Sequence, residues 1–393
     1  MPLARALAQA GHEVAFTTSP SYCSTIEAVG FRCFPAGYDW LVSEREPAYG
    51  HVRNLLADKD SFSPFIDVYV DFLPSRMAPD LLTIAGSWPP DIFVREPMEF
   101  AGCVVAEALD VPHAVCGPLF SYWQGAWHGA PGEVNKPNLD KLRQRHGLRA
   151  DPQLAMLHRD LYLAFLPPAF LHPDLQPPST VHFLRPVSFN QSGAETLPAW
   201  ITSLPARPTV HASLGTVFHR TPGVFEAIVE GVRDQEINLI LAVGRDQDPA
   251  AFDVQSPNVW IERYIPHALL LPHCDAVITH GGFSSVMACF EQGLPMVAVP
   301  LAGGDQPGNS QRCAALGVGR VVGPDERTPE LIRAALLDVL RDPKYRQNAI
   351  RLKQDLQSLP PVEHAVELLE MLAQGRAPVK TVAREVTDRD GRS

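Results

Sequence analysis

Long apolar runs, basic charge and paired cysteines are all scarce in this 393-residue chain. No window approaches the roughly 20 apolar residues that span a bilayer, and no signal peptide is recognisable at the start. There are 33 basic residues against 44 acidic ones, so the net charge of −11 argues against a nucleic-acid partner. The seven cysteines form no Cys-x-x-Cys pair, which fits a reducing cytoplasm and argues against a zinc site. We therefore expect a cytoplasmic protein with no transmembrane segment, either a monomer or a homodimer.

The remaining composition is that of a globular protein, with 46% hydrophobic and 20% charged residues. At ~150 residues per domain, the length predicts two domains. From residue 209 onward, predicted strands (209–213, 237–243, 259–265, 276–279 and 295–301) alternate with predicted helices (222–234, 267–271, 328–342, 343–357 and 362–374). This alternation is typical of an α/β fold with a parallel sheet covered by helices on both faces.

A strand, a glycine turn and a helix follow one another between residues 275 and 293. The strand leads into His280, Gly281 and Gly282, and we expect Ser284 and Ser285 to begin the helix. Glycines allow a ligand to approach the backbone closely, and the N-terminus of a helix favours an anion. A tight turn or a structural histidine would explain each feature singly, whereas their order favours a phosphate or diphosphate site.

The amino half has predicted strands over residues 13–18, 31–34, 91–95, 111–116, 161–166 and 181–184. A doubly wound domain normally opens with a strand, which lies centrally in its sheet, but here a helix over residues 2–10 comes first. We expect the reading frame to begin one strand and one loop before Met1, which the upstream DNA sequence would test. The aromatic loop over residues 120–128 is either a lid over an apolar ligand or a packed surface loop. Residues 189–208 are the best candidate for a linker.

Four motifs of the carboxyl half resemble the nucleotide-binding domain of family 1 glycosyltransferases, the UDP-glycosyltransferase-like group of the macrolide and natural-product type. They are Ser-Leu-Gly-Thr at 213–216, Tyr-Ile-Pro-His at 264–267, His-Gly-Gly-Phe-Ser-Ser at 280–285 and Gly-Asp-Gln-Pro-Gly-Asn at 304–309. The amino half resembles the family more loosely, through residues 2–14 and 90–97. The resemblance implies the GT-B fold, in which two Rossmann-like, doubly wound domains face a cleft.

The resemblance also implies the domain limits. Residues 1–188 would form an acceptor-binding domain without its first strand, and residues 189–207 a linker. Residues 208–360 would bind the nucleotide sugar. A helix over residues 361–376 would pack back on the amino-terminal domain, ahead of a tail over residues 377–393.

The donor site implied by the resemblance lies in the carboxyl half. The diphosphate would contact Gly215, Thr216, His280, Gly281, Gly282, Ser284 and Ser285. Tyr264 would stack on the base and Ile265 would hydrogen-bond it through its backbone, while Asp305 and Gln306 would hold sugar hydroxyls. Other interpretations stay open: Tyr264 as core, Thr216 as a helix cap, and Asp305 with Gln306 as a turn. The family often binds the ribose through a glutamate at the position of Ala288, so the sequence does not show which residue would contact the ribose here.

The resemblance implies an inverting glycosyltransferase that moves a sugar from a UDP- or dTDP-sugar to a hydroxyl of an apolar natural product, without a metal or other cofactor. The family's catalytic histidine lies in the loop after the first strand, which this sequence lacks, and Glu96 matches the acidic partner of that histidine. Trp123 and Trp127 are candidate walls of the acceptor site. The main alternative is a catalytically inactive auxiliary protein that binds a nucleotide sugar. A GT-B epimerase is a third possibility, although such enzymes have a polar cleft and this amino half is apolar.

Overall fold

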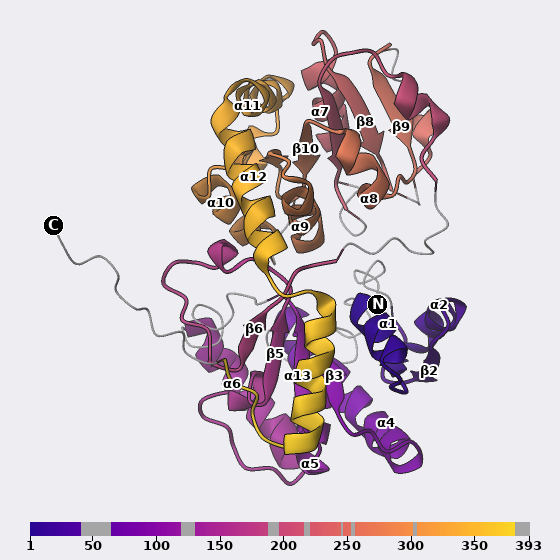
Figure 1. The fold of residues 1–393 in the computed structure, drawn as a ribbon, viewed down its shortest axis with the longest axis vertical. Helices are drawn as coiled ribbons and strands as arrows, with labels where there is room; N and C mark the ends of the chain where they lie inside the picture. Colours follow the sequence, from indigo (N-terminus) through magenta and orange to yellow (C-terminus); the bar gives the residue numbers. More distant parts are fainter. Residues whose placement is uncertain are drawn as a thin grey trace, which may run out of the picture.

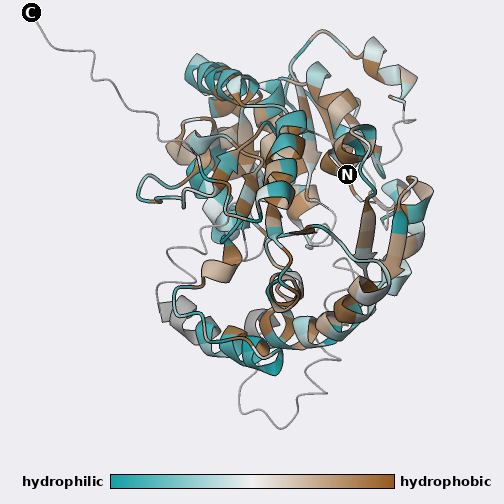
Figure 2. Ribbon diagram, turned by 60° about the horizontal axis from the view of Figure 1, so that its bottom comes forward, coloured by the Kyte–Doolittle hydropathy of each residue, from teal (hydrophilic) through white to brown (hydrophobic). Residues whose placement is uncertain are grey.

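The computed structural model describes residues 1–40, 64–118, 130–187, 196–215, 221–244, 247–252, 256–301 and 305–381. Two lobes lie one above the other along the long axis of the molecule, and the last long helix returns from the carboxyl lobe to the amino lobe (Figure 1). Hydrophobic residues concentrate along the strands and the inner faces of the helices, as Figure 2 shows.

Six parallel strands form the sheet of the carboxyl lobe, in the order β9-β8-β7-β10-β11-β12. They are β7 (Thr209–Ser213), β8 (Asn238–Ala242), β9 (Val259–Glu262), β10 (Ala276–Thr279), β11 (Met296–Ala298) and β12 (Gly319–Val321). The central strands are nearly continuous apolar runs, as a parallel sheet buried on both faces requires. The strand order reverses between β7 and β10. The carboxyl ends of these two strands therefore form the switch point at which such sheets bind ligands.

Alternate residues of these strands face two separate layers of helices. Val277 belongs to a core cluster with helix α9 and helix α12, whereas Ile278 belongs to a cluster with helices α7 and α11. The helices of this lobe are α7 (Val224–Val232), α8 (His267–Leu270), α9 (Phe283–Gln292), α10 (Gln306–Ala315), α11 (Pro329–Arg341) and α12 (Pro343–Ser358). Thr328 caps α11, because its side chain accepts from the Leu331 N–H.

The strands of the amino lobe form two sheets. β3 (Phe93–Arg95), β4 (His113–Gly117), β5 (Leu161–Ala164) and β6 (Val181–Phe183) pair in parallel in that order. β1 (Ala15–Thr18) and β2 (Arg32–Pro35) form a separate parallel pair. Within the described ranges, β1 and β3 each have a hydrogen-bonded neighbour on one side alone. These are the two strands that would flank the central strand expected from the resemblance.

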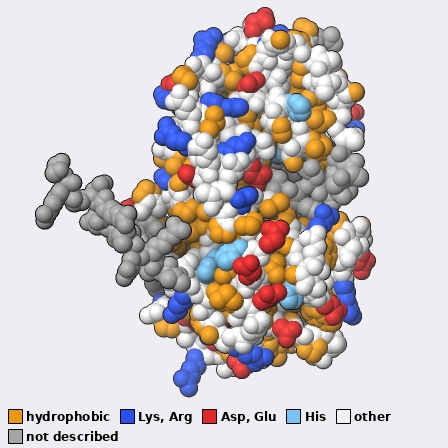
Figure 3. All heavy atoms as spheres, viewed as in Figure 1, with side chains coloured by type: hydrophobic (Ala, Val, Ile, Leu, Met, Phe, Trp, Pro, Cys, Tyr) orange, Lys and Arg blue, Asp and Glu red, His pale blue; other side chains and the backbone are white. Residues whose placement is uncertain are grey.

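Helices surround both amino-lobe sheets. They are α1 (Pro2–Gln9), α2 (Cys23–Ala28), the π-helical segment η3 (Pro64–Phe72), α4 (Leu73–Ser87), α5 (Ala101–Ala108) and α6 (Ala130–Arg145). Helix α13 (Val362–Gly375) packs Val366 and Leu369 in one cluster with Leu3 of α1 and Leu163 of β5. His12, which follows α1, lies 2.9 Å from Glu370 of α13. Acidic side chains gather on this face of the lower lobe in Figure 3, and Glu363 and Glu367 of α13 are exposed.

The two lobes contact each other through aromatic and backbone groups. The ring of Phe170 lies 5.5 Å from that of Phe290 and 6.5 Å from that of Phe283, both on α9. Arg312 of α10 donates to the carbonyl oxygens of Ala169 and Phe170. These contacts bring the amino end of α9, and with it the switch point, next to the amino lobe.

Several features were not predicted from the sequence. They are helices α2, α6 and α10, strand β12, and a disulfide between Cys23 of α2 and Cys33 of β2. The other five cysteines are free thiols, four of them buried. None of the helices in the described ranges is long and apolar enough to cross a membrane.

Candidate functional site

His280 lies at the carboxyl end of β10, between two glycines that its ring requires. A Cβ atom on Gly215, which follows β7, would lie 2.6 Å from His280 Cε1, and one on Gly282 would lie 2.4 Å from His280 Nε2. Gly215 and Gly281 also have φ values of +77° and +81°, a region that glycine adopts without strain. The glycines were predicted to allow a ligand to approach the backbone closely. In the structure Gly215 and Gly282 leave the space that the His280 imidazole ring occupies at the switch point.

The His280 ring is neutral at physiological pH. Burial lowers the pKa of His280 to about 4, although the Asp305 carboxylate opposes this shift. Its Nδ1 atom is buried and has no hydrogen-bond partner in the described part of the chain. A neutral imidazole carries one N–H donor, so this ring can donate one hydrogen bond without bringing a positive charge.

Helix α9 begins one residue earlier than predicted, and no serine caps it. Gly282 is the N-cap residue and makes no side-chain cap, while Ser284 is exposed and Ser285 half-buried in the first turn. The first N–H of the helix, at Phe283, donates instead to Asp305 Oδ2 over 3.0 Å. A carboxylate is stabilised at this position by the positive end of the helix dipole. Neither serine therefore caps the helix, and a carboxylate from 22 residues further along the chain accepts its first N–H instead.

One face of α10 packs against the His-Gly-Gly turn. Gln306, Asn309 and Ser310 are spaced at i, i+3 and i+4, which places them on one side of the helix. Gln306 is 3% exposed, and its Oε1 accepts from the Leu301 N–H over 2.9 Å. Ser310 is fully buried, and its Oγ would lie 2.3 Å from a Cβ on Gly281. Gly281 is therefore also required for the packing of α10.

Tyr264 and Ile265 differ in exposure after β9. Tyr264 is 41% exposed, so the interpretation that it is a core residue is wrong. Ile265 is 1% exposed and anchors the segment in the core. An exposed ring beside a buried anchor suits a stacking surface for a base.

Two histidines close to this segment, one of which follows Ile265 by two residues, were not predicted as part of the site. His211, on β7, is fully buried, and its Nε2 lies 3.1 Å from the Nε2 of His267, the first residue of α8. Burial lowers the pKa of both rings, and the proximity of His267 contributes to the low pKa of His280. The sequence signal for His267 was its place in the Tyr-Ile-Pro-His motif, whereas His211 looked like any strand residue.

Glu96 follows β3 in the amino lobe, in a turn organised by Arg95. The buried Arg95 guanidinium donates to the carbonyl oxygens of Glu96, Pro97, Glu99 and Leu157. The Glu99 carboxylate accepts from the N–H groups of Ala101 and Gly102 at the start of α5, both over 2.7 Å. Glu96 is exposed, yet the desolvation by surrounding protein raises its pKa to about 7, and the Glu99 carboxylate adds to this effect. It can therefore gain or lose a proton near neutral pH.

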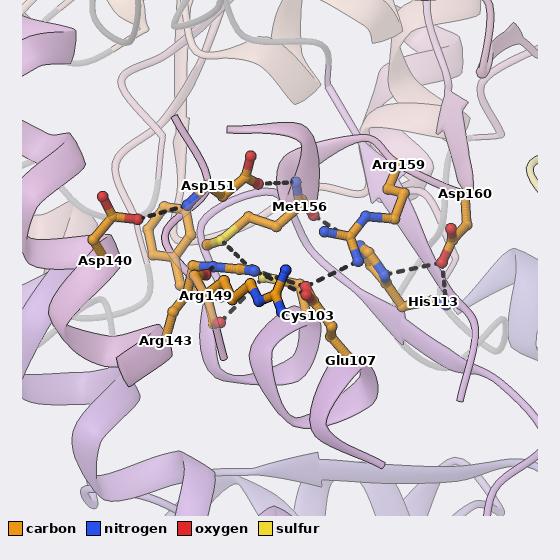
Figure 4. Close-up of polar contacts among 11 residues, drawn as sticks. Cys103, Glu107, His113, Asp140, Arg143, Arg149, Asp151, Met156, Arg159 and Asp160 are labelled. Atoms are coloured by element: carbon orange, nitrogen blue, oxygen red, sulfur yellow. Dashed lines mark hydrogen bonds and ion pairs between the residues drawn. The ribbon is translucent and has the colours of Figure 1, made fainter. Parts of the chain in front are cut away.

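A second polar cluster, in the amino lobe, is structural (Figure 4). Arg143 makes two 2.8 Å bonds to Glu107, which also pairs with Arg159 over 2.9 Å. His113 has Nε2 3.0 Å from the Met156 carbonyl oxygen and Nδ1 3.3 Å from Asp160. This geometry favours a doubly protonated ring, but burial is the larger effect and lowers the pKa of His113. The cluster lies at the amino ends of β4 and β5, and ligands bind such sheets at the opposite ends.

Three predicted site residues lie outside the described ranges: Thr216, Trp123 and Trp127. The structure brings Gly215, His280, Gly281, Gly282 and Asp305 together, and it places Tyr264 at the same edge of the sheet. Among the described residues, no group of three or more His, Cys, Asp or Glu side chains is arranged to hold a metal ion.

Comparison with known proteins identifies relatives along nearly the whole chain. Residues 5–215 match the N-terminal domain, and residues 226–372 the C-terminal domain, of the family described as erythromycin biosynthesis protein CIII-like. The chain is 27% identical to 4'-demethylrebeccamycin synthase of Lentzea aerocolonigenes, over 95% of both chains. It is 28% identical to 10-deoxymethynolide desosaminyltransferase of Streptomyces venezuelae, over 96% of this chain and 95% of the relative.

Solved structures share the fold. The glycosyltransferase VinC in complex with dTDP superimposes with a TM-score of 0.76 at 24% identity, over 95% of both chains. The spinosyn rhamnosyltransferase SpnG complexed with thymidine diphosphate gives a TM-score of 0.75 at 21% identity, over 94% of this chain and 95% of SpnG. The predicted two-domain GT-B fold is thereby confirmed. The chain belongs to the erythromycin biosynthesis protein CIII-like family of GT-B glycosyltransferases.

Proposed function

We propose that this glycosyltransferase moves a sugar from a dTDP-sugar to a hydroxyl of an apolar natural product, with inversion at the sugar carbon. The observation that carries the proposal is the neutral His280 ring at the switch point, whose buried Nδ1 has no hydrogen-bond partner among the described residues. A neutral donor beside the amino end of α9 stabilises the charge that develops on a departing diphosphate. The relatives named above, a desosaminyltransferase among them, support a natural-product acceptor.

Thymidine diphosphate is favoured over uridine diphosphate on two grounds. VinC and SpnG, which share the fold, were each solved with it. Ala288 of α9 occupies the position at which the family often binds the ribose. Its side chain is 7% exposed and belongs to the hydrophobic core. Deoxyribose has no 2'-hydroxyl, so its binding requires one hydrogen-bond partner fewer at that position than the binding of ribose does.

We propose the remaining roles from the family resemblance. His280, Ser285 and the amides around Gly215, Gly281 and Gly282 would hold the diphosphate, with Thr216 and Ser284 beside them. Tyr264 would stack on the base and Ile265 would bind it through its backbone. Asp305 and Gln306 would face the sugar, with Gln306 held in place through its Oε1, which accepts from the Leu301 N–H.

On the acceptor side, Glu96 would be the acidic group, and Trp123 and Trp127 would form walls of the site. We propose residues 1–188 as the acceptor domain and residues 208–360 as the donor domain. The linker over residues 189–207, the helix over residues 361–376 and the tail over residues 377–393 complete the organisation. No metal is proposed for the reaction.

Turnover and binding assays test the proposal together. The chain is incubated with a dTDP-sugar and a panel of polyketide acceptors, and released dTDP and glycosylated product are measured. Calorimetry compares dTDP with UDP, with His280→Ala as the site variant and His172→Ala, at an exposed histidine of the other lobe, as the control. Turnover that is lost in His280→Ala and kept in His172→Ala supports the proposal. Tight dTDP binding without turnover would favour the auxiliary protein, and no nucleotide binding at all would reject both.

A further inference from the structure

Asn309 joins the two halves of the donor site through its side-chain amide. Its Nδ2 lies 3.0 Å from the carbonyl oxygen of Gly281, in the His-Gly-Gly turn, and 2.9 Å from Asp305 Oδ2. An amide nitrogen has two hydrogens, so one can go to each acceptor. The turn proposed to hold the diphosphate and the carboxylate proposed to hold the sugar are therefore tied to one side chain.

The same contacts fix the direction of the Asp305 carboxylate. Oδ2 accepts twice, from the Phe283 N–H at the start of α9 and from Asn309. With one oxygen held from two directions, rotation of the carboxylate is restricted and its second oxygen, Oδ1, has a defined orientation. Oδ1 accepts no hydrogen bond from any described residue, and a carboxylate oxygen is a strong acceptor for a hydroxyl.

The location of Asn309 suits this role. It sits one turn after Asp305 on α10, and its neighbour Ser310 packs directly under Gly281. Asn309 is half-buried, so its amide is shielded from competing water without being part of the core. Because charge-assisted bonds are about twice as strong as neutral ones, the bond to Asp305 is the stronger of its two contacts.

We propose that Asn309 is a positioning residue for the sugar nucleotide: it orients Asp305 toward the sugar and holds the diphosphate turn at a fixed distance from it. This inference rests on the proposed function. It assigns to Asn309 no contact with the substrate, and its effect on the sugar passes through Asp305.

The test is a double-mutant cycle in the full chain, with KM for the dTDP-sugar and Kd for dTDP as readouts. Asn309→Ala should raise KM for the dTDP-sugar about 10-fold or more, because it removes a hydrogen bond to a charged group. Asp305→Ala should also raise this KM. In the Asp305→Ala background, Asn309→Ala should add less than about 3-fold, because the carboxylate that it orients is gone. Additive effects in the cycle would overturn the proposal.

Asn348→Ala is the matched control. Asn348 also donates from its side-chain amide to a backbone carbonyl in the same lobe, that of Gly317, over 3.0 Å. This variant should lose comparable stability and leave KM for the dTDP-sugar unchanged. If it raises KM as much as Asn309→Ala does, the effect at Asn309 is only structural and the proposal fails.

Asn309→Asp supplies a second readout that a structural role would not change. It places a carboxylate 2.9 Å from Asp305 Oδ2, so the pair repels until one member takes up a proton. The KM of this variant should fall as the pH is lowered from 8 to 6, toward the wild-type value. A pH-independent KM in this variant would contradict the inference. Binding of dTDP to the wild-type chain is measured in parallel. If the wild type does not bind dTDP, the proposed function itself is rejected, whereas normal binding with the contrary results above rejects only the inference about Asn309.

Discussion

His211 and His267 share one hydrogen bond, 3.1 Å between their Nε2 atoms, that fixes the tautomer of both rings. His211 Nδ1 lies 3.0 Å from the Ile240 carbonyl oxygen, which can only accept, so Nδ1 carries the hydrogen. The Nε2 of the neutral His211 ring is then an acceptor, and His267 Nε2 donates to it. The Nδ1 atom of His267 is therefore left as an acceptor.

The buried His211 makes the stability of the chain depend on pH. Burial and the nearby His267 lower the pKa of His211 to about 3, below its value in the unfolded chain. Its contribution to stability is fully present above about pH 6.5 and is lost as the pH falls toward 3. We expect the free energy of unfolding to decrease between pH 7 and 5, with this residue contributing up to ~1.4 kcal/mol per pH unit.

His211→Asn should flatten this dependence, because asparagine can keep the bond to the Ile240 carbonyl and does not titrate. Denaturation at several pH values measures the slope, with His172→Asn at an exposed position as the control. Parallel curves for the wild type and His211→Asn would show that the buried ring does not set the dependence.

Asparagine and glutamine at position 280 distinguish the two ring nitrogens. The amide nitrogen of asparagine reaches the place of Nδ1, and that of glutamine the place of Nε2. Because Nδ1 is the buried ring atom for which the described residues supply no partner, we expect His280→Asn to keep more affinity for dTDP than His280→Gln does. The difference should be about 5-fold to 10-fold, the value of one ordinary hydrogen bond, and calorimetry measures it. The reverse order would place the ligand contact on Nε2.

The sequence predicted the carboxyl-lobe fold well because its signals were local. Strands at 209–213 and 276–279 appear with the predicted ends, since their buried apolar runs are bounded by turn residues. The position of His280 at the switch point also followed from the order of strand, turn and helix. Helix α10 was missed because Pro307 and Gly308 near its start, together with its polar composition, resemble a loop.

The partners of the site could not be predicted, because they come from distant parts of the chain. Nothing near Phe283 in the sequence shows that Asp305 accepts its N–H. The two serines were expected to begin the helix, whereas its first N–H is bound through this tertiary contact. In the same way, His211 and His267 are 56 residues apart in the sequence. They meet because the fold brings β7 next to the segment that follows β9.

A methyl group at Gly282 should disturb the His280 ring. The backbone of Gly282 has φ −64°, which alanine adopts without strain, so the effect comes from the contact alone. A Cβ there would lie 2.4 Å from His280 Nε2, closer than atoms approach. We expect Gly282→Ala to raise KM for the dTDP-sugar about 10-fold or more, because a displaced His280 ring would lose its proposed hydrogen bond to the charged diphosphate. Gly308→Ala is the matched control, since no atom lies within 4 Å of its Cβ, and a comparable KM increase in that variant would contradict this account.

The disulfide between Cys23 and Cys33 should be detectable by counting thiols. Under denaturing conditions without reductant, five cysteines should react, and all seven should react after reduction. Because the two half-cystines are 10 residues apart, closing this short loop should contribute about 2–3 kcal/mol to the stability of the β1–β2 unit. The double variant Cys23→Ala/Cys33→Ala should show the same loss with and without reductant. Seven reactive thiols in the oxidised protein would exclude the bond.

Glu96 should give the reaction a pH dependence near neutrality. Desolvation raises its pKa to about 7, so its carboxylate form becomes predominant only above that pH. If the carboxylate takes part in removing the acceptor proton, kcat/KM should rise as the pH increases through about 7 and level off above it. Glu96→Gln should lower kcat/KM by about 100-fold or more and remove this inflection, because glutamine cannot accept a proton. Glu363→Gln, at an exposed carboxylate of α13, should leave the profile unchanged. An inflection near pH 7 that persists in Glu96→Gln would assign it to another group and leave Glu96 without a role in proton transfer.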